Sequence, residues 1–350
     1  GTGDDPVAAA DMYRVPRGSN LACATHPGQV RTINCDRCIV ADREALGGKA
    51  DAFLMVVDGM GANRRGDTAS RVAAEMVPQV LRSGLQALPD DPDSDQLASV
   101  LRDAVSVANL AVWKRAQEDP DLKGMGTTCV AALVRGSLAL ICHAGDSRAY
   151  WLSGNDFLQV TADHSLIQEV VPSDDTAVSV EDRFGAVITR GIGLSRSVET
   201  DLEVVKLGSR DALLLCTDGL TNMVGDQAIA TALAEAASAE EACERLISAA
   251  NNAGGLDNIG VAVLLGDEFA PYAFSRVGTD GIREPDRSVR RSRSRRSRCA
   301  WAPPVVVVLA LCCIVLSIGL ALALMDRSRL LSELDSARRP SAKTEVPAGG

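Results

Sequence analysis

Short apolar runs bounded by polar residues or glycine recur between residues 53 and 265 of the chain. Runs of this length with such boundaries are typical of buried β-strands. The pattern predicts strands at 53–57, 128–134, 138–144, 148–152, 157–160, 212–216 and 259–265.

Other segments of the same region carry apolar residues at helical spacing. They are 67–88, 95–117, 226–235 and 239–251. Asp67 and Ser94 are the predicted N-caps of the two longer helices. Strands and helices come in groups, without regular βαβ alternation, so the pattern predicts a layered α+β domain.

The longest apolar run, residues 305–325, contains no charged side chain. About 20 apolar residues cross the roughly 30 Å hydrocarbon core of a bilayer, so this run predicts a transmembrane helix. A buried helix of a soluble protein is the alternative. Arginines are concentrated before the run and basic residues are more dilute after it, which predicts a cytoplasmic body in the cell and an external tail.

Composition divides the chain further. We expect a loose leader at 1–20, a folded body at 21–266, an Arg/Ser-rich linker at 267–304, the membrane helix at 305–325 and a short tail at 326–350. The linker is expected to lie on anionic headgroups. Nucleic-acid binding by its arginines is the alternative.

The formal net charge is −10, and the acidic residues are concentrated in the body. An acidic body of this kind argues against nucleic acid as a partner. It remains compatible with phosphate chemistry if bound metal ions supply positive charge. The ten cysteines follow no framework spacing, so we expect free thiols in a reducing compartment. A zinc or redox site at Cys35-Asp-Arg-Cys38 is the alternative.

Aspartates at the edges of apolar runs are the candidate metal ligands. Asp58 and Asp218 each follow a predicted strand and precede glycine, and Asp257 lies between a glycine pair and the last strand. If these carboxylates converge, they repel one another unless a hard divalent cation such as Mg²⁺ or Mn²⁺ neutralises them. Asp146, in a turn between two strands, is a fourth candidate. Each residue taken singly is compatible with a plain turn.

Three further residues have both functional and structural interpretations. Arg31 comes shortly before a strand, and its guanidinium suits bidentate phosphate binding. His143 lies in an apolar run, which favours a hydrogen-bonded core histidine over a ligand. His164 is expected to cap a loop.

Eight segments, in this order, resemble the motifs of the metal-dependent protein phosphatases, the PPM or type 2C class, in its bacterial form. They are 28–36, 57–61 with 66–70, 124–128, 143–150, 161–166, 189–193, 215–220 and 255–259. The resemblance covers residues 25–266. It implies a four-layer αββα sandwich, in which two antiparallel sheets are flanked by helix pairs, with two metal ions at one edge.

The resemblance also implies roles for the candidate residues. Asp58 would bridge two Mn²⁺ or Mg²⁺ ions, and the Gly59 carbonyl would bind one of them. Asp218 and Asp257 would bind the other ion, and Asp146 with Asp218 would serve a possible third.

Arg31 would bind the phosphate, and residues 167–188 would form a variable flap beside the site. The implied reaction is hydrolysis of phosphoserine and phosphothreonine in proteins by direct attack of a metal-bridging water. Phosphorylated proteins, including Ser/Thr kinases and their substrates, are the implied partners, with the membrane as the attachment surface.

Four positions depart from the family pattern, and two of them, Ala62 and Gly260, carry no ligand. Cys35 stands where a glutamate is usual, beside Asp36. Both residues would lie next to the metal-binding residues without binding the metals directly. Met60 stands where many eukaryotic members have histidine. A membrane-tethered module that binds phosphoproteins with little hydrolysis is therefore the alternative function.

Overall fold

The computed structural model describes residues 19–61, 64–165 and 188–275. The chain divides into two compact units, 1–293 and 294–350, and the second lies outside the described residues. The predicted membrane helix and the tail also lie outside them, as do most of the predicted leader, flap and linker. Within the described residues, no helix is both long and apolar enough to cross a membrane.

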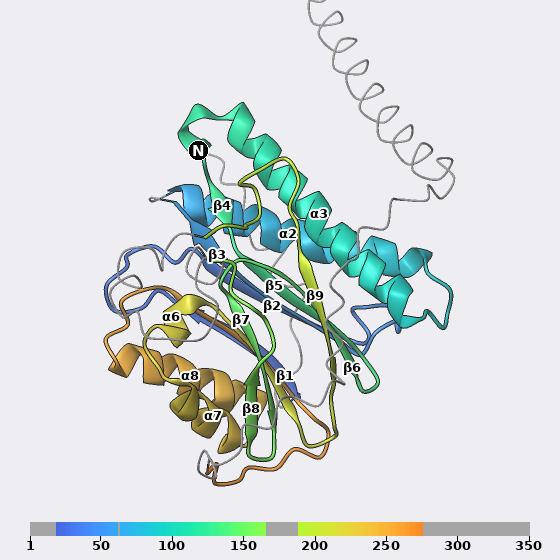
Figure 1. Cartoon of the computed structure of the whole chain (residues 1–350), viewed down its shortest axis with the longest axis vertical. Coiled ribbons are helices and arrows are strands. Elements are labelled where there is room, and N and C mark those ends of the chain that lie inside the picture. Colours follow the sequence, from blue (N-terminus) through green and yellow to red (C-terminus); the bar gives the residue numbers. More distant parts are fainter. Residues whose placement is uncertain (1–18, 62–63, 166–187, 276–350) are drawn as a thin grey trace, which may run out of the picture. The chain divides into compact units, whose positions relative to one another are not determined.

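Two antiparallel sheets form the centre of the described domain (Figure 1). The five-stranded sheet has, in spatial order, β1 (Leu21–His26), β11 (Ile259–Leu265), β10 (Ala212–Cys216), β7 (Arg148–Ser153) and β8 (Asp156–Gln159). The six-stranded sheet has β2 (Asp36–Asp42), β3 (Ala52–Met60), β5 (Cys129–Arg135), β6 (Leu138–Ala144) and β9 (Asp201–Lys206), with β4 (Gly126–Thr127) on β3. The predicted α+β class with two antiparallel sheets is confirmed.

Helices cover the outer face of each sheet (Figure 1). The long helices α2 (Arg64–Ala87) and α3 (Ser94–Glu118) pack on the six-stranded sheet, and the short η2 (Pro120–Leu122) follows them. The helices α7 (Asp226–Ala234) and α8 (Ala239–Asn252) cover the five-stranded sheet, with the single turn α6 (Asp218–Thr221) before them.

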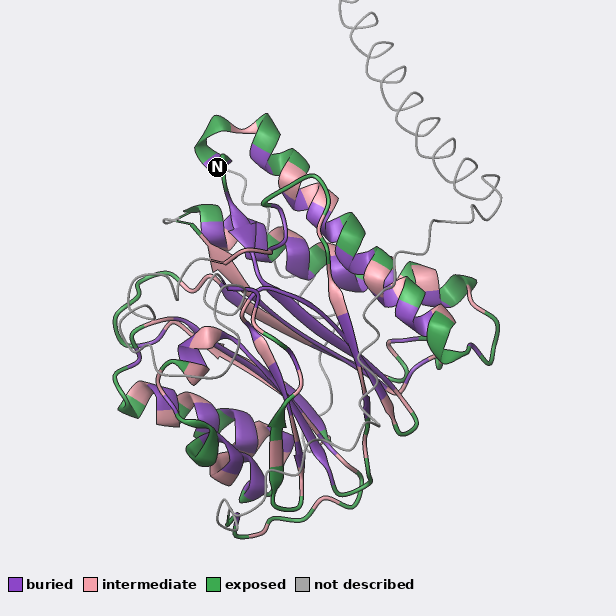
Figure 2. Ribbon diagram, viewed as in Figure 1, coloured by how far each residue is buried: buried purple, intermediate pink, exposed green. Residues whose placement is uncertain are grey.

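Three apolar cores hold these layers together, with the central strands buried on both faces and the helices buried on the faces toward the sheets (Figure 2). One core lies between the six-stranded sheet and its helices and includes Phe53, Leu81 and Leu101. A second lies between the sheets, and a third lies under α7 and α8. Burial of each large aliphatic or aromatic side chain contributes about 1.5–3 kcal/mol, so the sheets form a rigid support for the loops at their edge.

Several predicted boundaries need correction. Asp58 lies inside β3, which continues to Met60, because β4 pairs with the end of that strand. Asp218 does not end a strand but begins α6, with one residue between it and the end of β10. Asp67 is not an N-cap, since α2 is already helical at Arg64.

The N-cap of α3 is Asp93, one residue before the predicted Ser94. Its side chain accepts a hydrogen bond from the Gln96 N–H, and Gln96 Oε1 accepts one from the Asp93 N–H. This reciprocal capping box satisfies two donors of the first turn, which Ser94 could not do from inside the helix.

Candidate active site

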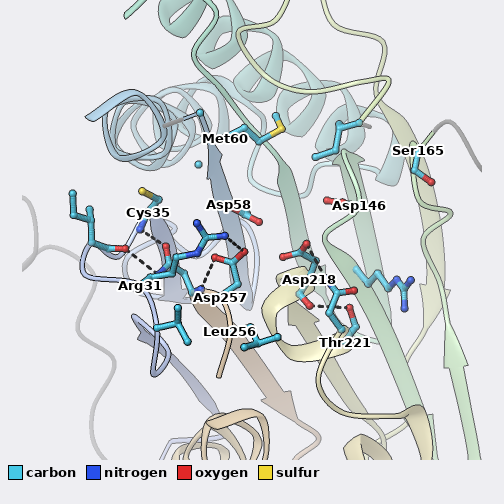
Figure 3. Close-up of a pocket in the computed structure, with 18 of the residues that line it drawn as sticks. Arg31, Cys35, Asp58, Met60, Asp146, Ser165, Asp218, Thr221, Leu256 and Asp257 are labelled. Atoms are coloured by element: carbon cyan, nitrogen blue, oxygen red, sulfur yellow. Dashed lines mark hydrogen bonds and ion pairs between the residues drawn. The ribbon is translucent and has the colours of Figure 1, made fainter. Parts of the chain in front are cut away.

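Loops at one edge of the sandwich enclose a cavity of about 1210 Å³. Its lining includes seven of the residues singled out in the sequence, which come from segments far apart along the chain (Figure 3). They are Arg31, Cys35, Asp58, Gly59, Asp146, Asp218 and Asp257. The structure therefore brings the predicted site residues to one place.

The strand ends and turns position the carboxylates. The Asp58 N–H donates to the Thr128 hydroxyl, and the Thr127 hydroxyl donates to the Asp58 carbonyl. The Thr128 hydroxyl also shares a 2.7 Å hydrogen bond with Ser147, the residue after Asp146. Two strands and the Asp146 turn are thereby fixed to one another.

Asp36 lies beneath the cavity and is fully buried. Its Oδ2 accepts a 2.8 Å hydrogen bond from the Thr217 hydroxyl, whereas its Oδ1 is buried without a hydrogen-bond partner among the described residues. Burial, and then the charges of Asp218 and Asp257, raise its pKa to about 7. Asp36, the predicted supporting residue, is therefore a buried acid below the candidate ligands, and no ion pair with a described residue offsets its burial.

The cavity carboxylates have the same deficit of positive charge. Burial, followed by the charges of Asp36 and Asp218, raises the pKa of Asp58 well above its usual range. Burial and the charge of Asp218 raise the pKa of Asp146 to about 7, and its Oδ1 also lacks a partner among the described residues. Buried acids in a shared cavity with orphaned oxygens are the environment that a divalent cation stabilises.

Arg31 lies on the rim of this cavity and contacts one of the acids. Its Nη2 donates to Asp257 Oδ2 at 2.8 Å, and both side chains are about half exposed (Figure 3). The Asp257 carboxylate raises the pKa of the Arg31 guanidinium further. The predicted phosphate-binding group is therefore a long, half-exposed side chain next to the predicted metal ligands.

Asn258 is a site residue for which the sequence analysis assigned no role. Its Oδ1 accepts from the Cys35 N–H at 2.7 Å, and its Nδ2 donates to the carbonyls of Pro27 and Ile33 at 3.0 Å each. The buried amide thus fixes both ends of the loop that carries Arg31. The sequence signals were its position directly after Asp257 and its place in the family-like segment 255–259.

Gly28 lies where the Arg31 loop packs against the loop of Asp257, and its φ is +79°. A Cβ there would lie 2.2 Å from the Asp257 carbonyl oxygen, so a side chain would separate the two loops. Glycine is required at this position by both its backbone conformation and the space available.

Cys35 faces the amino end of α2. The Asp67 N–H donates to its thiol, and burial, followed by the Asp67 charge, raises the pKa of Cys35. The thiol is therefore neutral near pH 7 and does not replace the charge of a carboxylate. In the described part of the chain, the seven cysteines are free and no group of potential metal ligands includes Cys35 or Cys38.

Another group of potential ligands lies behind the Asp146 turn. His143, His164 and Asp201 each offer an atom within 4.8 Å of the others, whereas no three cavity carboxylates come so close together. The imidazoles are stacked with centroids 4.7 Å apart. The Gly145 N–H donates to His164 Nδ1, so in the neutral ring the proton sits on Nε2, which lies 3.1 Å from Asp201.

Through these two hydrogen bonds, His164 links the Asp146 turn to β9. This structural role agrees with the expectation that His164 caps a loop. His143 differs from its prediction, because both of its ring nitrogens lack hydrogen-bond partners among the described residues. Burial lowers its pKa to about 4, and the residue is therefore a neutral core histidine without the expected hydrogen bonds.

Comparison with known families agrees with this geometry. Residues 39–253 match the sequence model of the family described as protein phosphatase 2C. The chain belongs to this family. The chain is also similar to the serine/threonine phosphatase stp of Listeria welshimeri, with 35% identity over 216 residues, 61% of this chain and 83% of the relative.

The serine/threonine protein phosphatase PstP of Mycobacterium tuberculosis is 33% identical over 256 residues, 72% of this chain but 46% of the relative. Solved structures agree. The S. agalactiae serine/threonine phosphatase has a TM-score of 0.62 at 31% identity and covers 70% of this chain and 98% of its own. The M. tuberculosis phosphatase PstP/Ppp has a TM-score of 0.58 at 31% identity, with the same two coverages.

Proposed function

We propose that this protein phosphatase 2C family member hydrolyses phosphoserine and phosphothreonine in proteins with the help of divalent cations. The observation that carries the proposal is the convergence of Asp58, Asp146, Asp218 and Asp257 on one cavity, with Arg31 on its rim. Family membership and the names of the relatives support the same reaction.

The cavity residues fit Mn²⁺ or Mg²⁺. Carboxylate and carbonyl oxygens are the ligands that these hard cations prefer. Asp58, the Gly59 carbonyl, Asp218 and Asp257 would hold two ions, and Asp146 with Asp218 would hold a third. The orphaned oxygens and raised pKa values of the buried acids are relieved when a cation is bound.

Bound cations lower the pKa of a water molecule and offset the charge of a phosphoryl group. The chain's own groups would orient the substrate. Arg31 is long and half exposed, so its guanidinium can exchange the Asp257 carboxylate for a bidentate contact with phosphate. Met60 offers no proton, so the leaving oxygen would take its proton from solvent.

We also propose that residues 305–325 anchor the protein in the cell membrane, with the catalytic body on the cytoplasmic side, where it would oppose Ser/Thr kinases. The uncharged apolar run and the arginines before it support this topology. Carbonate extraction of membranes tests it: the full chain should stay in the pellet, and release into the supernatant would contradict the anchor.

The direct test of the activity uses the full chain in detergent and a phosphothreonine peptide. We expect turnover with Mn²⁺, loss of turnover with EDTA, and loss in Asp218→Asn. Asp156→Asn, which changes an exposed acid on β8, is the matched control and should remain active.

A folded protein without turnover in any divalent ion would contradict the proposal. It would favour the tethered phosphoprotein-binding module, because the neutral Cys35 thiol lacks the charge of the glutamate usual at that position. Phosphopeptide affinity in the absence of turnover, with recovery of activity in Cys35→Glu, would identify that case.

A further inference from the structure

Three large apolar side chains are exposed at the edge of the catalytic cavity. Val30, Ile33 and Leu256 are 61%, 45% and 56% exposed, and all three line the cavity. We call them the apolar rim. Figure 3 shows Leu256 beside Asp257, on the same side of the cavity as Arg31. Exposed apolar groups gathered around a polar site indicate a contact surface more often than singly scattered ones.

The apolar rim is built on two loops that are firmly joined. The Gln29 N–H donates to the Gly255 carbonyl at 2.7 Å, and Arg31 bonds to Asp257. The buried Asn258 side chain ties the ends of the first loop to the second. Because the backbone is held in this way, the three side chains cannot withdraw from water by a local rearrangement.

The opposite wall of the cavity has a different character. It carries Arg148 and Asp163, joined by a salt bridge at 2.7 Å, together with Ser165 and its bridge partner Ile188, which is half-buried. Figure 3 shows Ser165 and Asp146 on that side. A chain that crosses the cavity with its phosphate at Arg31 therefore meets three exposed apolar side chains on one flank and a mainly polar wall on the other.

We propose that the apolar rim binds an apolar side chain of the phosphoprotein substrate, one or two positions from the phosphorylated residue and on one side of it only. The inference rests on the proposed function. Val30 directly precedes Arg31 and Leu256 directly precedes Asp257, so phosphate binding brings the flanking substrate residue against the rim. Adjacent residues are about 3.8 Å apart, which puts the first two neighbours within reach.

The experiment compares phosphothreonine peptides with a polar host sequence and a single leucine at −2, −1, +1 or +2. Partial burial of a leucine side chain predicts about a fivefold gain in kcat/KM, through KM, on one side of the phosphothreonine. The variants are Val30→Ser and Leu256→Ser, with Leu158→Ser as control. Leu158 is 40% exposed on β8 and does not line the cavity.

We expect the ratio of leucine to polar peptide to fall to about one in both rim variants and to persist in Leu158→Ser. An unchanged ratio in the rim variants, or an equal fall in the control, overturns the inference. A rise in activity toward every peptide alike, as if a segment of the chain itself had been displaced, also overturns it.

A small aryl phosphate, which has no flanking residues, separates the two proposals. Turnover of this compound by the wild-type protein without any leucine preference overturns the apolar rim and leaves the phosphatase intact. Absence of turnover of every phosphoester, by a protein that thermal unfolding shows to be folded, overturns both.

Discussion

The cavity carboxylates and the stacked histidines are neighbouring buried clusters that differ in what burial does to them. Burial raises the pKa of Asp58 and Asp146, so in the absence of cations they keep their protons to a higher pH than an exposed carboxyl does. Burial lowers the pKa of His143, which loses its proton. Both groups become neutral because desolvation disfavours whichever form is charged.

The two clusters differ in their access to solvent as well as in the direction of their pKa shifts. The carboxylates line a cavity of about 1210 Å³, so a cation can reach them and restore their charged form. His143 is 1% exposed and packs against His164, so it is neutral without any ligand. Access to solvent thus distinguishes the half-buried carboxylates, which we propose bind cations, from the fully buried histidines.

The largest effect is expected for Asp58→Asn. Asparagine keeps the shape of the protonated acid but removes the negative charge that would hold the cations. We expect at least about a 10³-fold loss in kcat/KM, of the size found when a group central to charge stabilisation is removed. Thermal stability in EDTA should be unchanged or higher, and a large fall in stability would show that Asp58 is needed for folding instead.

Asn258→Ala tests whether the hydrogen bonds of Asn258 are needed to hold the Arg31 loop beside the carboxylates. Loss of its three hydrogen bonds should release the Arg31 loop, with about a 10- to 100-fold loss in Mn²⁺ affinity or activity, as is typical of residues that support metal ligands. Measurement of KM and kcat against Mn²⁺ concentration checks this. Asn252→Ala, an exposed position on α8, should behave like wild type.

Without bound metal, the free energy of unfolding should depend on pH because of the raised pKa values of the buried carboxyl groups. The folded pKa values of Asp36 and Asp146 are about 7, above the usual 3.9 of the unfolded chain. The folded state therefore binds more protons between about pH 4 and 7, and its stability falls as pH rises through that range.

Urea unfolding in EDTA should show a loss on the order of 2 kcal/mol for each of these two acids between pH 5.5 and 8. Mn²⁺ should weaken or reverse the trend, because cations stabilise the deprotonated acids. An EDTA-treated protein that is more stable at pH 8 would contradict the raised pKa values.

The histidine cluster should show the opposite slope. The folded pKa of His143 is about 4, below the usual 6.5, so the folded state binds fewer protons between those values. Its contribution to stability is present above pH 6.5 and is lost as pH falls toward 4. His143→Phe should reduce the loss between pH 7 and 5.5 by about 1 kcal/mol in urea unfolding. An identical pH dependence in the variant would show that His143 does not carry it.

Strong local patterns were enough to predict much of the fold. The predicted strands 138–144, 212–216 and 259–265 match β6, β10 and β11 at both ends, because they are continuous apolar runs buried on both faces. The hydrophobic pattern did not predict β1 and β9, because their mixed polar and apolar residues form no clear apolar run. Their assignment depends on pairing with β11 and β6.

The sequence by itself determined the elements with strong periodicity, the acidic residues available for cations and the order of the family's motifs. Only the tertiary structure showed that Arg31 pairs with Asp257 and that Asn258 holds Cys35, since these partners lie 226 and 223 residues apart. The burial of Asp36 and the grouping of the apolar rim were likewise decided by packing. Local sequence encodes propensity, whereas desolvation and proximity arise only when distant segments meet.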